Sequence, residues 1–488
     1  MHETNPSHID LQAAAKQIMT RYGFEPEFPD EVCAELDDLK KNPPPIAVTG
    51  DARDLRSLLW SSIDNDTSRD LDQIEVAESL SNGDVKVTIG IADVDAYASK
   101  QTPIDQHAAC ETTTVYTGVR NFPMLPEELS TGATSLLEGQ DRLSVVTEFV
   151  VGSDGNLKSS SVYRAIVCNK AQLQYNSVGG WLESTCPAPS KVAASADLQA
   201  QLKLQDQVAQ RLKMQRVEHG ALNLETDEIR PQIVDDKIVG LAKQQKNRAT
   251  DLIEDFMVAA NGVVARFLEN VSSLRRIVRT PERWDRIVQL AATKGEKLPA
   301  QPDSKALNDF LLRRKAADPD HFADVSLIVI KLIGPGEYVL ERPGEVVSGH
   351  FGLAVQDYTH STAPNRRFAD IVTQRLIKSM LAGQSNPYSD DELTAIASNC
   401  TKKEDAARKV EREMSKRIAA VAMQSHVGEV FDAIVTGVTD HGTFVRVLRP
   451  HIEGLLAQGE HGLDVGDRLR AKLIRTDVQK GYIDFARA

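Results

Sequence analysis

The sequence predicts an α+β protein in which a mixed sheet surrounded by helices forms the main body, a small helical segment precedes it, and a five-stranded OB-type β-barrel follows it. Three observations predict this. Strand-like alternation dominates residues 65–170, helical periodicity dominates residues 195–425, and short strand-like segments fill the tail from about residue 427. The length of 488 residues exceeds the usual size of one domain. We therefore expect three units, spanning 1–48, 49–425 and 426–488.

Composition and charge exclude several classes of protein. The 57 Lys and Arg residues against 70 Asp and Glu residues give a net charge of −13, so the chain will not bind nucleic acid indiscriminately. No apolar run approaches the ~18 residues of a membrane-spanning helix, and the N-terminus has no secretory signal. The five cysteines are scattered singly, which disfavours a disulfide framework or a zinc site. We expect a cytoplasmic protein without a membrane partner.

The first unit should contain two short helices and a linker. Leu11 to Tyr22 has apolar residues at helical spacing, and Pro29-Asp30-Glu31 has the pattern of a helix start. The run Asn42-Pro43-Pro44-Pro45 then predicts an extended linker. A helical cap is the simpler interpretation of this unit, and a small nucleic-acid-binding module is the alternative.

The body should begin with a hairpin and continue with long helices. Gln73–Ala77 and Val85–Ile89 alternate in hydrophobicity around Asn82-Gly83, a dipeptide typical of tight hairpin turns. Further strands are predicted at 144–151 and 160–168, and helices at 195–217, 246–272, 304–317, 371–380 and 402–425. In the tail, barrel strands are predicted at 430–436, 442–447, 454–457, 468–474 and 481–485.

Four carboxylates gather within nine residues: Asp64, Asp66, Asp70 and Asp72. Such clustering raises mutual repulsion unless a cation lies between the groups, and hard oxygen ligands favour magnesium, manganese or calcium. A solvated acidic loop, a calcium loop and a catalytic magnesium site all remain open. The calcium loop would start at Asp64 and end at Glu75, but Arg69 stands where its turn needs glycine, and a strand is predicted where its second helix should follow.

A basic cluster follows about 300 residues later. Arg366 and Arg367 come after Pro364, and we expect them in the first turn of the helix at 371–380. Guanidinium groups there are expected to bind an anion, since their forks match phosphate oxygens. The alternative is an internal ion pair, for Arg367 with Asp370 in particular.

Four blocks in this order resemble the ribonuclease II / RNB exoribonuclease family: 62–73, 116–130, 252–261 and 358–370. The similarity covers about residues 49–425. The tail is similar to the ribosomal-protein-S-one-type OB domain that closes many members, through the segments 428–431, 442–445, 453–455 and 465–467.

The resemblance implies magnesium-dependent hydrolysis of single-stranded RNA from its 3′ end, with release of 5′-mononucleotides; Mn²⁺ is the alternative ion. It implies that Asp64, Asp70 and Asp72 bind metal, with Gln73 beside them, and that Asp70, Asp72 and Arg366 serve catalysis. The RNA contacts that it implies in the body are Tyr116, Tyr175, Glu254, Arg366 and Arg367. Each has an ordinary alternative: a core tyrosine, a surface glutamate or an internal ion pair.

On the barrel, the predicted RNA contacts are Phe431, His441 and Phe444, which would stack on bases, and Arg475, which would bind phosphate. The alternatives are core residues for the two phenylalanines and an exposed turn residue for His441. No obligate protein partner can be inferred.

The chain also departs from the family pattern. Gln73 stands where a second consecutive aspartate is usual, and Ser361 and Asn365 stand where apolar or aromatic residues are usual. Fewer than 50 residues precede the body, so the paired cold-shock barrels of many members are not expected. The leading hypothesis is an exoribonuclease. The alternatives are an RNA-binding protein that has lost turnover through Gln73, and a calcium-binding protein.

Overall fold

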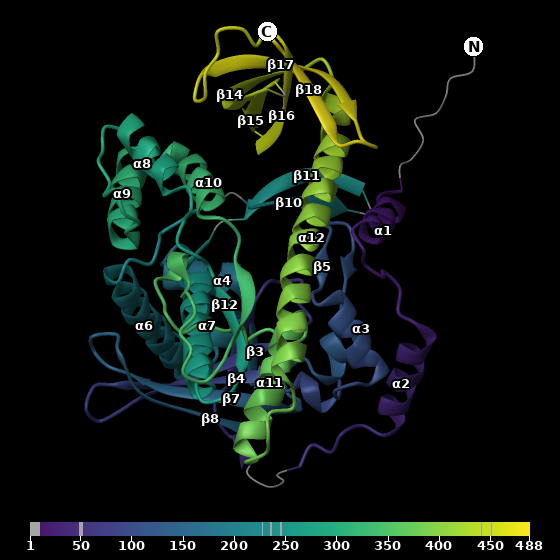
Figure 1. Ribbon diagram of the computed structural model, residues 1–488, viewed down its shortest axis with the longest axis vertical. Coiled ribbons are helices and arrows are strands. Elements are labelled where there is room, and N and C mark those ends of the chain that lie inside the picture. Colours follow the sequence, from purple (N-terminus) through teal and green to yellow (C-terminus); the bar gives the residue numbers. More distant parts are fainter. Residues whose placement is uncertain are drawn as a thin grey trace.

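A long helix joins the α+β body to a barrel at one end of the molecule (Figure 1). The structure is a computed structural model that describes residues 10–47, 52–226, 228–234, 237–244, 246–440, 442–449 and 451–488. Within these residues no helix is long and apolar enough to cross a membrane. All five cysteines are free.

The body contains a seven-stranded mixed sheet. Its strands follow the order β1-β8-β7-β4-β3-β2-β9, in which β1 pairs with β8 and β9 with β2 in parallel, and the other neighbours are antiparallel. The strands span Arg53–Asp54 (β1), Ser61–Asp64 (β2), Gln73–Ser79 (β3), Val85–Ala92 (β4), Asp141–Val151 (β7), Leu157–Cys168 (β8) and Ala171–Gln174 (β9). The predicted hairpin is confirmed as β3 and β4, and Gly83 adopts the positive φ of +83° that its turn requires.

Helices and short strands surround this sheet. Those between the sheet strands and the long helices are α3 (Pro103–Glu111), β5 (Val115–Tyr116), β6 (Asn121–Phe122), α4 (Tyr175–Leu182) and α5 (Ser190–Ala193). The helices α6 (Ala196–Glu218), α7 (Arg248–Phe267) and α11 (Phe368–Leu381) pack on the large core that includes the sheet. The remaining strands of the body pair as β10 (Glu228–Val234) with β11 (Lys237–Gln244) and β12 (Ser273–Ile277) with β13 (Glu337–Glu341).

Three helices form a lobe with its own apolar core: α8 (Trp284–Thr293), α9 (Ser304–Ala317) and α10 (Phe322–Ile333). Single helical turns elsewhere span Val94–Ala96, Leu129–Ala133, Pro319–His321, Phe351–Leu353 and Gln424–His426.

The helix expected from residue 402 begins earlier, and α12 spans Asp390–Met423. Ser389 and Glu392 form a capping box, in which each side chain accepts a hydrogen bond from the other residue's backbone N–H. Acidic residues in the first turn stabilise the helix by their favourable interaction with the positive end of the helix dipole. These local signals start the helix twelve residues before the prediction.

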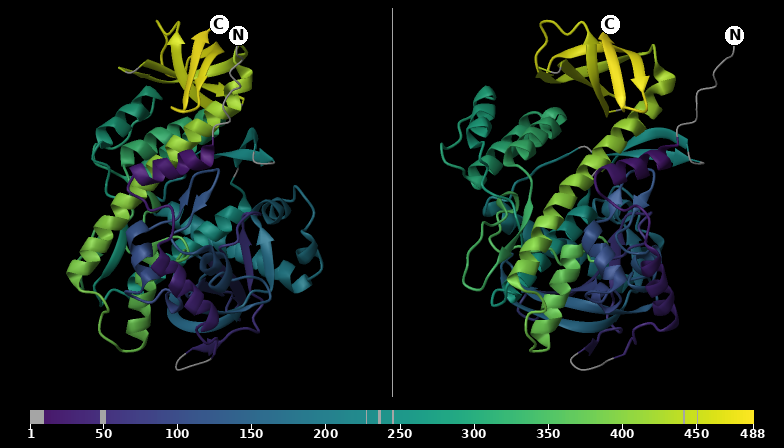
Figure 2. Two further views of the ribbon diagram at one scale, coloured as in Figure 1. Left: turned by 90° about the vertical axis from the view of Figure 1, so that its right-hand side faces the viewer. Right: turned by 45° about the vertical axis from the view of Figure 1, so that its right-hand side comes forward.

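The predicted pair of N-terminal helices is confirmed as α1 (Leu11–Arg21) and α2 (Asp30–Lys41). The Asp10 carboxylate accepts two backbone N–H groups at the start of α1. Arg21 forms an ion pair with Glu413 of α12, and Figure 2 shows α1 beside that helix.

The tail is a closed barrel with its own core. Its strands are β14 (Val430–Thr439), β15 (Gly442–Leu448), β16 (His451–Gln458), β17 (Arg468–Asp477) and β18 (Tyr482–Arg487). They close in the order β14-β15-β16-β18-β17, with β16 parallel to β18, which confirms the OB-type prediction. Gly454 in β16 is required by close packing, because a Cβ there would lie 2.4 Å from the carbonyl oxygen of Ile483.

Candidate active site

The segment 64–72, called the aspartate loop below, connects strand β2 to its neighbour β3. Asp64 is the last residue of β2, and Asp72 lies directly before β3. The Asp64 carboxylate accepts hydrogen bonds from the Ser68 hydroxyl and the Asn65 backbone N–H, both at 2.7 Å. Leu71 anchors the loop because its N–H donates to the Ser135 hydroxyl at 2.9 Å. Asp64 is therefore positioned by the end of β2, and Asp72 by the hydrogen-bonded loop that leads into β3.

Asp72 is the most enclosed acid of the loop, with 3% of its surface exposed. One carboxylate oxygen accepts the backbone N–H of Asn365 at 2.9 Å, and the other lies 3.6 Å from Nε of Arg366. Burial raises the pKa of Asp72 to about 8, although Arg366 and the Asn365 N–H both act to lower it. The structure thus brings the predicted arginine to the predicted aspartate across nearly 300 residues of sequence.

The two arginines have different environments. The Arg366 side chain is 47% exposed, so its guanidinium can bind a further anion. Arg367 binds both Asp370 carboxylate oxygens, at 2.9 Å through Nε and at 2.8 Å through Nη2, which is the internal pair considered from the sequence. A phosphate would have to compete with Asp370 for those nitrogens of Arg367.

The predicted position of both arginines in the first helical turn is wrong. Helix α11 begins at Phe368, and Arg367 is its N-cap residue. The backbone at this point is bonded to another segment: Thr114 N–H donates to the Arg366 carbonyl at 3.1 Å, and Phe368 N–H donates to the Thr112 carbonyl at 2.8 Å. These long-range bonds hold Arg366 outside the helix and beside Asp72.

Three polar residues position the segment that carries Arg366, a role that sequence reasoning missed: Asn261, Asn365 and Thr134. Asn261 of α7 is buried, and its side-chain amide oxygen accepts both the N–H and the hydroxyl of Ser361 at 2.9 Å. The Asn365 side-chain oxygen accepts the Thr134 hydroxyl at 2.6 Å, while its backbone N–H holds Asp72. The sequence did carry a signal for this role, because Ser361 and Asn365 are polar where the family usually has apolar or aromatic residues.

Two tyrosines lie close to these charges. Desolvation raises the pKa of Tyr116 in β5; the charge of Arg366 opposes this shift, and Asp70, Asp72 and Asp64 add to it. Desolvation followed by the charges of Asp64 and Glu75 raises the pKa of Tyr175, the first residue of α4. Tyr116 is 39% exposed, so part of the ring is free to contact a ligand.

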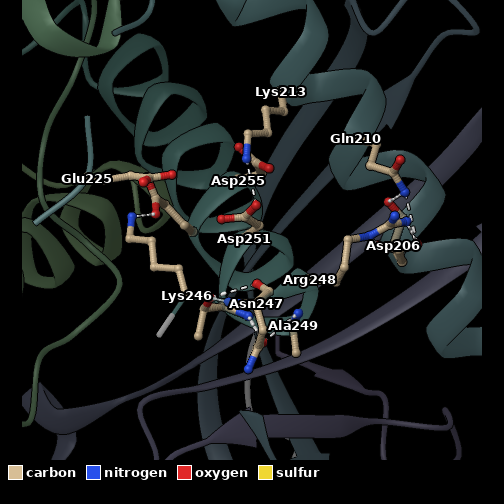
Figure 3. Close-up of polar contacts among 12 residues, drawn as sticks. Asp206, Gln210, Lys213, Glu225, Lys246, Asn247, Arg248, Ala249, Asp251 and Asp255 are labelled. Carbon is tan, nitrogen blue, oxygen red and sulfur yellow. Dashed lines mark hydrogen bonds and ion pairs between the residues drawn. The ribbon is translucent and has the colours of Figure 1, made fainter. Parts of the chain in front are cut away.

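Glu254 lies on α7, which packs against α4, the helix that begins at Tyr175. Its carboxylate is 45% exposed and pairs with Lys246 at 2.7 Å. Figure 3 shows the polar contacts that hold α7 against α6: Arg248 donates to Asp206 at 2.9 Å, and Lys213 to Asp251 at 2.6 Å. These contacts fix the helix that carries Glu254.

The predicted RNA contacts on the barrel lie in a different part of the molecule from the aspartate loop. Phe431 and Phe444 are partly buried on β14 and β15, and the Arg475 side chain on β17 is 64% exposed. The barrel lies at the end of the molecule away from β3 and β4 (Figure 1). His441 lies outside the described residues.

The donor set fits a hard divalent cation by its chemistry. Asp64, Asp70, Asp72 and Gln73 can all offer oxygen ligands. Burial raises the pKa of Asp70, backbone hydrogen bonds and the charge of Arg366 oppose this shift, and the charge of Asp64 adds to it. In the part of the chain that the structure describes, no three acidic, histidine or cysteine side chains are close enough together to hold one ion. The expected convergence of three aspartates on one ion is therefore not observed.

Glu75 is a further acid beside this site. It is fully buried in β3, and burial followed by the charge of Asp64 raises its pKa well above the usual value. Its position in a strand also weakens the calcium-loop alternative, which needs a helix after the loop.

Comparison with known proteins assigns both parts of the chain. Residues 52–383 match the RNB domain, and residues 429–488 match the RNase II-type exonuclease C-terminal S1 domain. Ribonuclease R of Thermotoga maritima is 30% identical over 94% of this chain and 68% of its own length. Ribonuclease R of Escherichia coli is 30% identical over 88% of this chain and 54% of its own length. The chain thus spans about half to two thirds of these relatives.

Solved structures show the same fold. Mycoplasma genitalium RNase R in complex with ribose methylated single-stranded RNA aligns with a TM-score of 0.87 at 22% identity, over 98% of this chain and 78% of that one. Yeast Ssd1, described as a pseudonuclease, aligns with a TM-score of 0.71 at 17% identity, over 91% of this chain and 55% of that one.

Proposed function

Because the chain belongs to the RNB family of 3′–5′ exoribonucleases, we propose that it hydrolyses single-stranded RNA from the 3′ end with Mg²⁺ and releases 5′-mononucleotides. The contact of Arg366 with the buried Asp72 is the observation that carries this proposal. A buried acid and a half-exposed guanidinium, adjacent in space, are what a reaction on a phosphodiester requires.

Each residue has a separate role in the proposal. Arg366 binds the scissile phosphate and stabilises the negative charge that grows there, since its contact with Asp72 fixes the orientation of its fork. Asp72 is held by the Asn365 N–H, so its carboxylate needs no reorganisation when substrate binds. When bound, a divalent cation supplies Lewis-acid activation of water and offsets phosphate charge. Asp64, Asp70, Asp72 and Gln73 would hold that cation.

RNA is held by stacking and by charge. Tyr116 and Tyr175 stack on the bases nearest the site, and Glu254 contacts a base from α7. Phe431, His441, Phe444 and Arg475 of the barrel bind the strand further from the reaction. Arg367 contributes by supporting the loop through Asp370 and adds positive potential near the phosphate.

We also propose three units, 1–48, 49–425 and 426–488. Separate apolar cores in the body and the barrel support this division. The free cysteines are consistent with a reducing compartment, and we assign the protein to the cytoplasm.

A 5′-labelled single-stranded oligoribonucleotide incubated with the purified protein and Mg²⁺ tests the activity. We expect a ladder that shortens from the 3′ end and stops when EDTA is added. Intact RNA together with a clear gel shift would instead favour an RNA-binding protein without turnover, the alternative that Gln73 and the likeness to a pseudonuclease support. Calcium binding that is tight and indifferent to RNA would favour the third hypothesis.

A further inference from the structure

Three buried residues between the helical turn Leu129–Ala133 and β7 contact both sides of the candidate site. Thr134, Ser135 and Leu136, called the linking segment below, have at most 3% of their surface exposed. They belong to no helix or strand. Buried polar groups outside regular structure need hydrogen-bond partners in the surrounding chain, so the partners of this segment show what it holds in place.

The Ser135 hydroxyl holds the aspartate loop on both sides of Asp70. It donates to the Arg69 carbonyl at 2.6 Å and accepts the Leu71 N–H at 2.9 Å. Asp70 lies between the two residues that this one hydroxyl binds, and Asp72 follows directly after them. The hydroxyl therefore fixes the backbone that carries both aspartates.

Thr134, the preceding residue, holds the segment that carries Arg366. Its hydroxyl donates to the Asn365 side-chain oxygen at 2.6 Å, and the Asn365 backbone N–H donates to the Asp72 carboxylate at 2.9 Å. Arg366 follows directly, 3.6 Å from the other Asp72 oxygen. Two adjacent residues thus bind the two halves of the site, one the loop of the acid and the other the segment of the arginine.

The linking segment is itself fixed to the large sheet. Arg142 of β7 donates through Nε to the Ser135 carbonyl at 2.9 Å. The Asn169 side chain donates to the Leu136 carbonyl and to the hydroxyl of Ser62 in β2, both at 2.9 Å. The segment is therefore a rigid support that can transmit the position of one half of the site to the other.

We propose that Ser135 is a positioning residue, which holds Asp72 against Arg366 through the linking segment. The inference rests on the proposed function and deepens it, because the Asp72–Arg366 contact carries that function. A hydroxyl is both a donor and an acceptor, so it can fix two backbone groups, whereas alanine fixes neither. Loss of this hydroxyl loosens the aspartate loop and, with it, the Asn365 N–H on Asp72. Misplacement of this kind lowers a rate more than it weakens binding.

Amide hydrogen exchange of the full chain without RNA tests the positioning directly. In Ser135→Ala, exchange should be about tenfold faster in peptides that cover 69–73, and also in peptides that cover 361–367, to which Ser135 makes no hydrogen bond among the described residues. Ser326→Ala is the matched control, because the fully buried Ser326 hydroxyl accepts the Glu225 N–H at 3.2 Å in another part of the molecule. The control should leave exchange in both segments unchanged.

Single-turnover cleavage and RNA affinity in EDTA separate positioning from packing. Ser135→Ala should cleave about tenfold more slowly at saturating RNA, with a dissociation constant within about twofold of the unmodified protein. Ser135→Cys fills the same space with a weaker hydrogen-bonding group, so its rate should lie between those of serine and alanine. Arg142→Lys leaves Ser135 in place and replaces the guanidinium by an ammonium group. It should slow cleavage several-fold, and it serves as the second variant if Ser135→Ala does not fold.

The outcomes separate the inference from the proposed function. Faster exchange confined to 69–73 would overturn the inference, since Ser135 would then support only its own loop. Equal rates of Ser135→Cys and the unmodified protein would assign the residue to packing and also overturn it, as would normal cleavage by Ser135→Ala. Faster exchange in both 69–73 and 361–367, in a protein that leaves RNA intact, would support the positioning and overturn the proposed function.

Discussion

The aspartate loop and the barrel place charged groups in opposite ways. Asp72 is buried, and a backbone N–H and a guanidinium fix its two oxygens. On the barrel, Arg475 is 64% exposed and lies 3.5 Å from Asp477. Buried and oriented groups lower a reaction barrier, whereas exposed cations and aromatic faces hold a strand with little sequence preference. We therefore expect substitutions in the loop to change the rate and substitutions in the barrel to change the affinity.

The largest effect should come from Asp72→Asn. The amide keeps the acceptor for the Asn365 N–H but loses the charge, so cleavage should fall by about 10³-fold or more while RNA affinity stays within about threefold. Single-turnover cleavage and filter binding measure the two quantities. Asp66→Asn, at an exposed position of the same loop, should behave as the unmodified protein does.

Arg366→Lys should reduce the cleavage rate by about 10²-fold, because an ammonium group keeps the charge but cannot form the planar fork on phosphate. The exposed Arg69 of the aspartate loop provides the control, and Arg69→Lys should leave the rate unchanged. Equal effects of the two substitutions would show that only the general positive potential matters.

Thr134→Val should reduce the rate by about tenfold, because it removes the hydroxyl that holds the Asn365 side chain and so loosens the N–H on Asp72. Thr134→Ser retains the hydroxyl and should restore the rate. If both variants lose the same activity, the residue supports packing and does not orient Asp72.

A smaller effect is expected from the barrel. Phe444→Ala combined with Arg475→Ala should weaken RNA binding several-fold and lower the slope of log K against log salt by about 1, while the rate at saturation is unchanged. Binding titrations at several salt concentrations check this. An unchanged slope would show that Arg475 does not contact an RNA phosphate.

The smallest expected effect is on the pH dependence of the free energy of unfolding, through Asp72 of the aspartate loop. Burial raises the pKa of Asp72 from 3.8 to about 8, so the folded state binds this proton more tightly than the unfolded state does. The free energy of unfolding therefore falls as pH rises from about 4 to about 8, and Asp72→Asn lacks this contribution. In EDTA, the variant should gain melting temperature over the unmodified protein as pH increases. Parallel curves for the two proteins across this range would contradict the prediction.

The sequence was sufficient for much of the fold because the decisive signals are local. The β3–β4 hairpin follows from alternation around Asn82-Gly83, and the barrel follows from short segments separated by turns. The meeting of Asp72 with Arg366 was predicted from a family resemblance and could not follow from periodicity, since nearly 300 residues separate them.

Other features depend on contacts that no local pattern encodes. Helix α11 starts at Phe368 because residues 112–114 bind the backbone before it. Glu75 resembles an ordinary polar residue of a half-exposed strand, and it is buried because α6 covers β3. The support that Asn365 gives Asp72 likewise appears only when two distant loops are brought together.

Measuring the saturated single-turnover rate and the dissociation constant for RNA on three proteins tests the division of roles most directly: the unmodified chain, Asp72→Asn, and the double variant at Phe444 and Arg475. We expect Asp72→Asn to lower only the rate and the barrel variant to raise only the dissociation constant. A barrel variant that loses the saturated rate, or an Asp72→Asn protein that still cleaves at a normal rate, would contradict the assignment of chemistry to the buried aspartate.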